Sequence, residues 1–261
     1  MTLSPSNLIV QGFWTGPLTT MERLSMASFI ANGHCYALYC YDVPAGVPAG
    51  VEVRDAREIL PESEAATFRC PQQFSDWFRI KLLLDKGGWH SDLDNICLRP
   101  LDFPAPYVFY SDHDDSTISL ALAKAPAASP LLQHCHDYIS SLTADERSRL
   151  PWQAIGSDFI CGAIEYFKMT EFVQPGYIFD PVQHEHIRSL VDPAAEFDLS
   201  RAYSLHLFHA AWNDGPQDST GEGFDLGRRL WGQRLDTNAQ YDLNCLYEKL
   251  KAKFLPKGDT L

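Results

Sequence analysis

The first half of the chain alternates short apolar runs rich in β-forming residues with longer runs whose apolar residues recur at helical spacing. The short runs favour strands, and the longer ones favour helices with one apolar face. The predicted strands cover residues 7–14, 35–42 and 51–56, and the predicted helices cover 19–33 and 72–88. Alternation of this kind predicts an α/β domain with helices on the faces of a central sheet.

Both helices carry boundary signals. Thr19 precedes the first helix and Glu22 stands three residues later, which is the pattern of a capping box. The second helix ends at two consecutive glycines, Gly87 and Gly88, which predict a tight turn into the next segment.

The segment "WHSDLDNICL" (89–98) follows that turn and is typical of a strand. Because side chains alternate along a strand, Asp92 and Asp94 are predicted to lie on one face. Two adjacent carboxylates repel each other, and burying either one is costly unless a partner neutralises it. A divalent cation removes both costs, and oxygen ligands suit Mg²⁺ or Mn²⁺, which complete their shells with water and substrate phosphates. The pair predicts a metal–diphosphate site at the end of a strand, with a solvated strand end as the alternative.

The second half is less regular. Its predicted strands are 107–112 and 117–125, the latter with a helix start as the alternative, and its predicted helices are 129–142, 156–167 entered through Ser157, and an amphipathic helix at 241–255. Segment 204–212 is predicted as a short buried strand or turn. No repeat or linker divides the chain, so we expect a single domain over 1–261, with 213–261 as a C-terminal helical extension.

Composition limits the partners. The chain has 21 Lys and Arg residues against 34 Asp and Glu residues, a formal net charge of −13, so nonspecific binding to nucleic acid is not expected. A phosphate partner must be met by a metal ion or by a few placed cations. The seven cysteines include no C-x-x-C pair, which argues against a disulfide framework or a cysteine zinc site. Neither a signal-peptide pattern nor a run of about 18 apolar residues is present, so a cytoplasmic protein without a transmembrane segment is predicted.

Residues 75–102, "SDWFRIKLLLDKGGWHSDLDNICLRPLD", resemble the D-x-D region of sugar-nucleotide-dependent glycosyltransferases of the glycosyltransferase family 32 type. These enzymes are related to the catalytic domains of the large clostridial glucosylating toxins. Residues 7–42 resemble the first strand, aromatic–Trp turn, helix and second strand of the same group, and residues 176–182 and 205–212 resemble its late segments more loosely. The resemblance implies a GT-A fold, a Rossmann-like nucleotide-sugar-binding domain with a mixed central sheet flanked by helices.

The resemblance also implies a metal site. Asp92 and Asp94 match the D-x-D acids, which hold Mn²⁺ or Mg²⁺ against the donor diphosphate. His206 falls in the region that completes the metal or diphosphate shell. Asp158 lies in a segment, 155–160, that departs from the Gly-Pro expected there, and it is the candidate for a residue beneath the reacting carbon of the sugar. The implied catalytic residues are Asp92, Asp94, Arg79 and Asp158, and the implied metal ligands are Asp92, Asp94 and His206.

A donor-binding set follows from the same resemblance. Trp14 falls where an aromatic side chain packs against the nucleotide base, with core packing as the alternative. Asp76 and Arg79 fall where the related toxins hold the donor sugar and phosphate, and their spacing places them on one helix face, where a surface ion pair is the alternative. The implied donor-binding residues are Trp14, Thr15, Asp76, Arg79, Asp92 and Trp212. For Trp212 a structural role is equally compatible with the sequence, and His209 is interpreted as a core histidine.

These features predict a retaining, metal-dependent glycosyltransferase. It would move a hexose or N-acetylhexosamine from a nucleotide sugar, with UDP as the family expectation, to a saccharide or lipid-linked acceptor in the synthesis of surface polysaccharide or lipopolysaccharide. We expect it in the cytoplasm, with peripheral contact at the inner face of the membrane left open. The alternatives are a toxin-type enzyme that glycosylates proteins and a noncatalytic module that binds calcium or carbohydrate.

Other polar clusters have simpler explanations. The acidic run "SDHDD" (111–115) is typical of a solvated loop. His184, Glu185 and His186 lack the spacing of a zinc motif. A pair of arginines, Arg228 and Arg229, could meet an acceptor phosphate or an anionic membrane, or belong to a solvated helix face.

Overall fold

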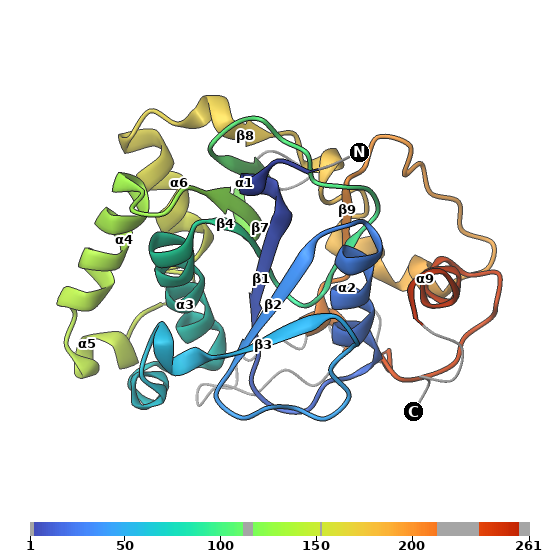
Figure 1. Cartoon of the computed structure of the whole chain (residues 1–261), viewed down its shortest axis with the longest axis horizontal. Coiled ribbons are helices and arrows are strands. Elements are labelled where there is room, and N and C mark those ends of the chain that lie inside the picture. The colour runs from blue at the N-terminus through green and yellow to red at the C-terminus, as the bar shows by residue number, and fades with distance from the viewer. Residues whose placement is uncertain (1–2, 112–116, 152, 213–234, 256–261) are drawn as a thin grey trace.

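The computed structural model describes residues 3–111, 117–151, 153–212 and 235–255 of the chain. Its centre is a seven-stranded mixed sheet in the order β3-β2-β1-β4-β7-β6-β8 (Figure 1). The strands are β1 (Ile9–Phe13), β2 (Cys35–Cys40), β3 (Val51–Asp55), β4 (Gly88–Ser91), β6 (Val108–Ser111), β7 (Ile118–Ala125) and β8 (Val173–Gln174). A second sheet pairs β5 (Asn95–Cys97) with β9 (Ser204–His206). The predicted α/β class, with a mixed central sheet flanked by helices, is confirmed.

The order of the strands reverses next to β1. Strand β1 pairs in parallel with β2 and β4, β2 pairs in parallel with β3, and β6 pairs in parallel with β8. Strands β4 and β6 are both antiparallel to β7. The chain therefore builds β2 and β3 on one side of β1 and returns to place β4 on the other. Gln11 lies opposite His90, so the carboxyl ends of β1 and β4 meet at one edge of the sheet.

Helices flank the sheet on both sides. Figure 1 shows α3, α4 and α6 on one side and α2 with α9 on the other. The α-helices are α1 (Pro5–Leu8), α2 (Thr20–Ala31), α3 (Pro71–Lys86), α4 (Pro130–Ser141), α5 (Ala144–Ser148), α6 (Ser157–Tyr166), α7 (His209–Trp212) and α9 (Leu246–Phe254). Short 3-10 helices are η1 (Ala56–Glu58), η2 (Glu62–Thr67), η3 (Thr170–Phe172), η4 (Gly176–Ile178) and η5 (His184–Val191). Phe78 and Ile80 lie in the core on the α3 side, and Phe29 and Trp89 lie in the core on the α2 side.

Local sequence signals account for several helix boundaries. The predicted capping box of α2 is present, because the Thr19 side chain caps the first turn and Glu22 Oε2 accepts the Thr19 N–H at 2.5 Å. Helix α3 ends at Gly87, whose φ of 66° is left-handed and where a Cβ would lie 2.5 Å from Ala127 N. Only glycine fits such a position. Helix α4 begins at Pro130 and is capped by Ser129, whose side chain accepts the Leu132 N–H.

The strand predicted through both acids is wrong. β4 ends at Ser91 and β5 begins at Asn95, and the two strands belong to different sheets. Asp92 and Asp94 therefore lie in the turn between them. Leu93 is only 2% exposed and anchors this turn in the core. The chain leaves the central sheet here because β5 pairs with β9, a partner far along the sequence that local patterns do not reveal.

Other predicted elements shift at their ends. Segment 7–14 divides into α1 and β1, and segment 204–212 divides into β9 and α7. Segment 117–125 forms the strand β7 rather than a helix. Helix α6 is entered through Gly156 instead of Ser157.

The predicted C-terminal extension is described only over residues 235–255, where α9 forms the later part of the amphipathic helix expected at 241–255 and begins five residues after the predicted start. Residues 213–234 lie outside the described part of the chain. No helix within the described ranges is long and apolar enough to cross a membrane.

Candidate active site

The segments that leave the carboxyl ends of β1 and β4 form the candidate site. In open α/β sheets the point where the strand order reverses opens a crevice in which ligands bind. Trp14 follows β1 and is tied to β2, since its backbone N–H donates to Tyr39 O at 3.0 Å. Asp92 follows β4. The fold thus brings two separately predicted residues to the same edge of the sheet.

Hydrogen bonds fix the turn that carries the two acids. The Asp92 N–H donates to Ala121 O at 2.7 Å, and the side-chain amide of buried Asn95 donates to the same oxygen at 2.9 Å. On the other side of the turn, the Leu207 N–H donates to Asp94 O at 2.8 Å. The turn is therefore held between β7 and the segment that joins β9 to α7.

Both carboxylate oxygens of Asp92 have side-chain partners. Oδ2 lies 3.1 Å from Arg79 Nη1, and Oδ1 lies 3.0 Å from His90 Nε2. Burial lowers the pKa of His90, which favours a neutral ring that donates its Nε2–H to Asp92. Arg79 Nη2 also lies 3.3 Å from Asp76 Oδ1. The predicted pair on α3 is therefore joined, and Arg79 connects it to the D-x-D turn.

The amino end of α6 packs against Asp76. A Cβ on Gly156 would lie 3.0 Å from Asp76 Oδ2, so a larger residue would press on the carboxylate. Burial raises the pKa of Asp76 to about 6, although the charge of Arg79 opposes the shift. Asp158 lies in the first turn of α6 and is exposed. The fold therefore brings the start of α6 to the site, with Asp158 two residues after the packed glycine.

Asp94 is held through one oxygen only. Its Oδ2 lies 3.2 Å from His206 Nε2 and accepts the backbone N–H of His209 at 2.8 Å. Burial alone would raise the pKa of Asp94, but the charge and hydrogen bond of His206 hold it below its ordinary value. Burial alone would lower the pKa of His206, but Asp94 raises it to about 9. Asp94 Oδ1 is buried, and no donor in the described part of the chain reaches it.

Gly12 allows a close approach beneath the turn. A Cβ at this position of β1 would lie 2.4 Å from Tyr36 Oη and 2.9 Å from Ser91 O. Burial raises the pKa of Tyr36, and the charges of Asp92 and Asp94 add to the shift, so the phenol stays neutral. Any larger residue at position 12 would displace either the Tyr36 ring or the start of the turn.

The side chains of the D-x-D turn and His206 fit a divalent cation that takes few protein ligands. Asp94 Oδ1 offers a buried oxygen without a hydrogen-bond donor, whereas both oxygens of Asp92 are engaged. His206 is charged as long as it keeps its proton, so it would coordinate only after releasing it. Among the described residues, no three His, Cys, Asp or Glu side chains are arranged to bind a metal. Asp94 would be the main protein ligand, as where Mg²⁺ or Mn²⁺ takes most of its shell from water and phosphate oxygens.

Trp14 lies beside this group. Its Nε1–H donates to Pro17 O at 3.1 Å, and its ring makes a T-shaped contact with the His209 ring at a centroid distance of 5.5 Å and an interplanar angle of 84°. Thr15, the next residue, is exposed. The indole is therefore fixed by its N–H and by a T-shaped contact with the His209 ring, and it is only half-buried.

Trp212 is not brought to the site surface. Its side chain is fully buried, its Nε1–H donates to Leu207 O at 2.8 Å, and it packs against Tyr247 with ring centroids 4.7 Å apart. The indole ring therefore presents no surface on which a nucleotide could pack. Of the two interpretations of Trp212, the structure supports the structural one and not donor binding.

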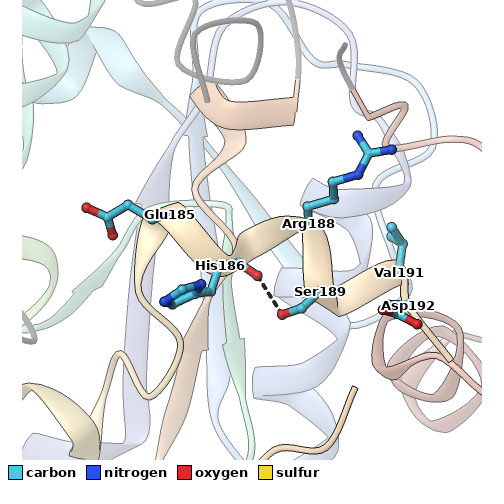
Figure 2. Close-up of a pocket in the computed structure, with 6 residues that line it drawn as sticks. All are labelled: Glu185, His186, Arg188, Ser189, Val191 and Asp192. Atoms are coloured by element: carbon cyan, nitrogen blue, oxygen red, sulfur yellow. Dashed lines mark hydrogen bonds between the residues drawn. The ribbon is translucent and has the colours of Figure 1, made fainter. Parts of the chain in front are cut away.

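The second histidine–acid cluster does not form a metal site. A pocket along η5 is lined by Glu185, His186, Arg188, Ser189, Val191 and Asp192. Figure 2 shows these side chains leaving η5 in different directions, so they do not converge on one point. This agrees with the spacing argument against zinc. The predicted acidic loop, apart from Ser111, and the Arg228–Arg229 pair lie outside the described residues.

Sequence reasoning missed three residues that shape the site. His90 was a polar residue in an otherwise apolar strand, and Asn95 directly followed the acid pair, so both carried a weak signal. His209 was assigned to the core, but its side chain is 29% exposed and lies against Trp14 and Glu22. No local pattern could have placed it there.

Neither a protein-family model nor a curated protein sequence matches the chain. Among solved structures, the chain is similar to one described as "PaToxG Glycosyltransferase", with 13% sequence identity and a TM-score of 0.45 over 63% of this chain and 70% of that one. Such a distant likeness transfers neither a function nor a residue role. The function is therefore inferred from the geometry of the site.

Proposed function

We propose that the protein is a metal-dependent glycosyltransferase that takes a hexose or N-acetylhexosamine from a nucleoside diphosphate sugar, with UDP as the expected nucleotide. One observation carries the proposal. The D-x-D turn lies at the carboxyl end of β4, where the strand order reverses, and Trp14 stands at the adjacent end of β1. An aromatic ring beside a pair of acids at such an edge suits a ligand with a base at one end and a diphosphate at the other.

Different residues would bind the base and the diphosphate of the nucleotide sugar. The half-buried Trp14 ring would stack on the base. Asp94 would hold the metal ion through Oδ1, which no hydrogen-bond donor among the described residues reaches. Asp92 would not bind the cation directly but would orient Arg79, which already lies 3.1 Å from it. In this division Asp94 binds the metal ion, and Asp92 positions the guanidinium of Arg79.

Charge development at the leaving diphosphate is the chemical problem that the site must solve. A bound Mg²⁺ or Mn²⁺ would supply electrostatic stabilisation of the departing oxygen. Arg79 adds a second positive charge that Asp76 and Asp92 hold in place, so the guanidinium needs little reorganisation during the reaction. With retention of configuration, the leaving phosphate oxygen can take the proton of the acceptor hydroxyl on the same face of the sugar. The proposal therefore requires no general base from the chain.

The acceptor side of the proposal rests on the sequence alone. We infer a saccharide or lipid-linked glycan acceptor in surface-polysaccharide synthesis, in the cytoplasm. Asp158 is the acid nearest the start of α6 and would face the sugar rather than the metal. Asp158→Asn should lower the transfer rate but leave the affinity for UDP and Mn²⁺ unchanged.

The first experiment is a thermal-shift panel of UDP-, GDP-, dTDP- and CMP-sugars with and without Mn²⁺, on the wild type and on Asp94→Asn. Ligands that bind only the native state raise Tm with saturation. We expect one nucleotide class to raise the Tm of the wild type only with metal, and the variant to fold but lose the shift. If no nucleotide raises the Tm under any metal condition, the donor site is wrong. A shift with Ca²⁺ alone would then favour the noncatalytic module.

A further inference from the structure

Glu22 does more than cap a helix. Its side chain is fully buried, and Oε2 accepts the Thr19 N–H at 2.5 Å in the capping box of α2. Helix α5 has the same box, formed by Thr143 and Glu146, and there the glutamate is exposed. Capping therefore does not require burial, and burying a carboxylate is costly unless a partner compensates it. The second oxygen of Glu22 needs a reason to be inside.

His209 supplies that reason. Its Nε2 lies 3.3 Å from Glu22 Oε1, an ion-pair distance without the geometry of a full hydrogen bond. The same imidazole meets Trp14 edge-on at 5.5 Å, and the backbone N–H of His209 donates to Asp94 Oδ2 at 2.8 Å. One residue on α7 therefore contacts the predicted base-stacking residue, the predicted metal ligand and a buried acid on α2.

The backbone before His209 is constrained to make this arrangement. Phe208 has a φ of 52°, in the left-handed region that non-glycine residues rarely adopt. This conformation directs the His206 side chain and the His209 N–H to the same oxygen of Asp94. The Phe208 ring stacks on His206 at a centroid distance of 3.9 Å, which offsets part of the strain.

We propose that Glu22 and His209 form a positioning pair that fixes the Trp14 indole relative to Asp94. This proposal deepens the proposed function, on which it rests, by tying the base end of the donor site to its diphosphate end. A fixed separation between the two ends means that a nucleoside diphosphate meets both at once without ordering the protein first. Neither Glu22 nor His209 touches the reacting atoms, so both act through Trp14 and Asp94.

The test compares two ligands that differ in the base. UDP with Mn²⁺ occupies both ends of the site, whereas pyrophosphate with Mn²⁺ occupies only the diphosphate end. Glu22→Gln keeps an oxygen for the Thr19 N–H but replaces the carboxyl group that faces His209 with an amide, and His209→Gln keeps the backbone N–H to Asp94. Calorimetric titration should show about tenfold weaker UDP binding for each variant and unchanged pyrophosphate binding. Combining both substitutions should add little, because each removes the same contact.

Glu146→Gln is the matched control, because it makes the same change in the capping box of α5. It should leave both affinities at the wild-type values. Equal losses for UDP and pyrophosphate in Glu22→Gln and His209→Gln would overturn the positioning role, since a general loss of structure affects both ends. Unchanged UDP binding in both variants would overturn it as well. If Glu22→Gln does not fold, His209→Gln decides alone, because the His209 side chain is partly exposed.

A second readout separates this inference from the proposed function. In protein labelled with 5-fluorotryptophan, the Trp14 resonance is assigned with Trp14→Phe. We expect that resonance to move in Glu22→Gln and His209→Gln, and to stay in place in Glu146→Gln. If the wild type binds no nucleotide but the resonance moves, the donor function fails and the positioning pair stands. If the resonance stays in place in both variants, Glu22 and His209 do not position Trp14, whatever the protein binds.

Discussion

Each acid of the D-x-D turn contacts a histidine, but one of these histidines is neutral and the other is protonated. In the pair on β4, burial lowers the pKa of His90, and Arg79 supplies the positive charge beside Asp92. In the pair with β9, the histidine itself is charged, because Asp94 raises the pKa of His206 to about 9 against the effect of burial. His90 and Arg79 together satisfy both carboxylate oxygens of Asp92, whereas no donor in the described part of the chain reaches Asp94 Oδ1. Two acids with one residue between them can therefore serve different purposes, one in orientation and one in ligand binding.

The largest effect is expected when each acid of the D-x-D turn is replaced by its amide. Asp94→Asn should reduce the rate of UDP-sugar hydrolysis or transfer by about 100-fold or more, because it removes the charge that holds the cation. Asp92→Asn should cost about tenfold, since it weakens only the orientation of Arg79. Initial rates of UDP release at saturating Mn²⁺ measure both, and Tm values confirm that each variant folds. Equal losses for the two variants would contradict the separate roles.

A second test breaks the Asp92 side of the comparison. Arg79→Lys keeps the charge but cannot reach Asp76 and Asp92 together as the guanidinium does, so we expect about a tenfold lower rate and weaker UDP binding. Arg149→Lys is the control, because Arg149 pairs with Asp145 at the exposed surface. Such a pair contributes little. If the Arg79 variant retains full activity, the contact between Arg79 and Asp92 is not needed for catalysis.

A third test uses alkaline pH on metal-free protein in the presence of chelator. The folded pKa of His206 is about 9, above the ordinary value of 6.5, so between these values the folded state keeps a proton that the unfolded state has lost. The His206–Asp94 pair contributes fully to the free energy of unfolding below about pH 6.5, and this contribution is lost as pH rises through 9. His206→Gln should therefore show a smaller fall in Tm between pH 7 and 9.5 than the wild type. Parallel Tm profiles would mean that His206 is not charged in the folded protein.

The smallest effect is expected at acid pH from His90. Its folded pKa is lowered by burial, so below pH 6.5 the unfolded state takes up a proton that the folded state resists. Stability from the neutral ring is present above about pH 6.5 and is lost as pH falls. Other histidines, including His34, share this direction, so the informative quantity is the difference between variants. His90→Gln should flatten the Tm profile between pH 5 and 6.5 by a few degrees. A steeper profile than the wild type would contradict the neutral state of His90.

Short-range signals located most of the site but not its connections. The capping box at Thr19, the glycine stop of α3 and the Asp76–Arg79 pair were all predicted, because each depends on residues within one or two helical turns. The contacts that give the acids their roles join Asp94 to His206 and Glu22 to His209. These partners are far apart in sequence, and no spacing rule relates them.

Trp212 and His209 show the limit from opposite directions. Both lie in one apolar segment, in which the sequence favours a core histidine and leaves Trp212 open between the core and the donor site. In the structure the tryptophan is enclosed by the core, and the histidine reaches the site. Burial of a side chain depends on what other segments cover it, which hydrophobicity of the residue itself does not specify.

By itself, the sequence determined the α/β class, a few helix boundaries such as the capping box at Thr19, and the presence of two acids after a glycine turn, because these follow from periodicity and local hydrogen bonding. Only the tertiary structure decided that the acids lie in a turn between two sheets and which oxygen of each remains available. Those outcomes depend on pairing between β5 and β9 and on the packing of α2, α3 and α7 around the turn. The electrostatic state of a carboxylate is set by whichever charges and donors the fold brings within a few ångströms, and distant segments supply most of them here.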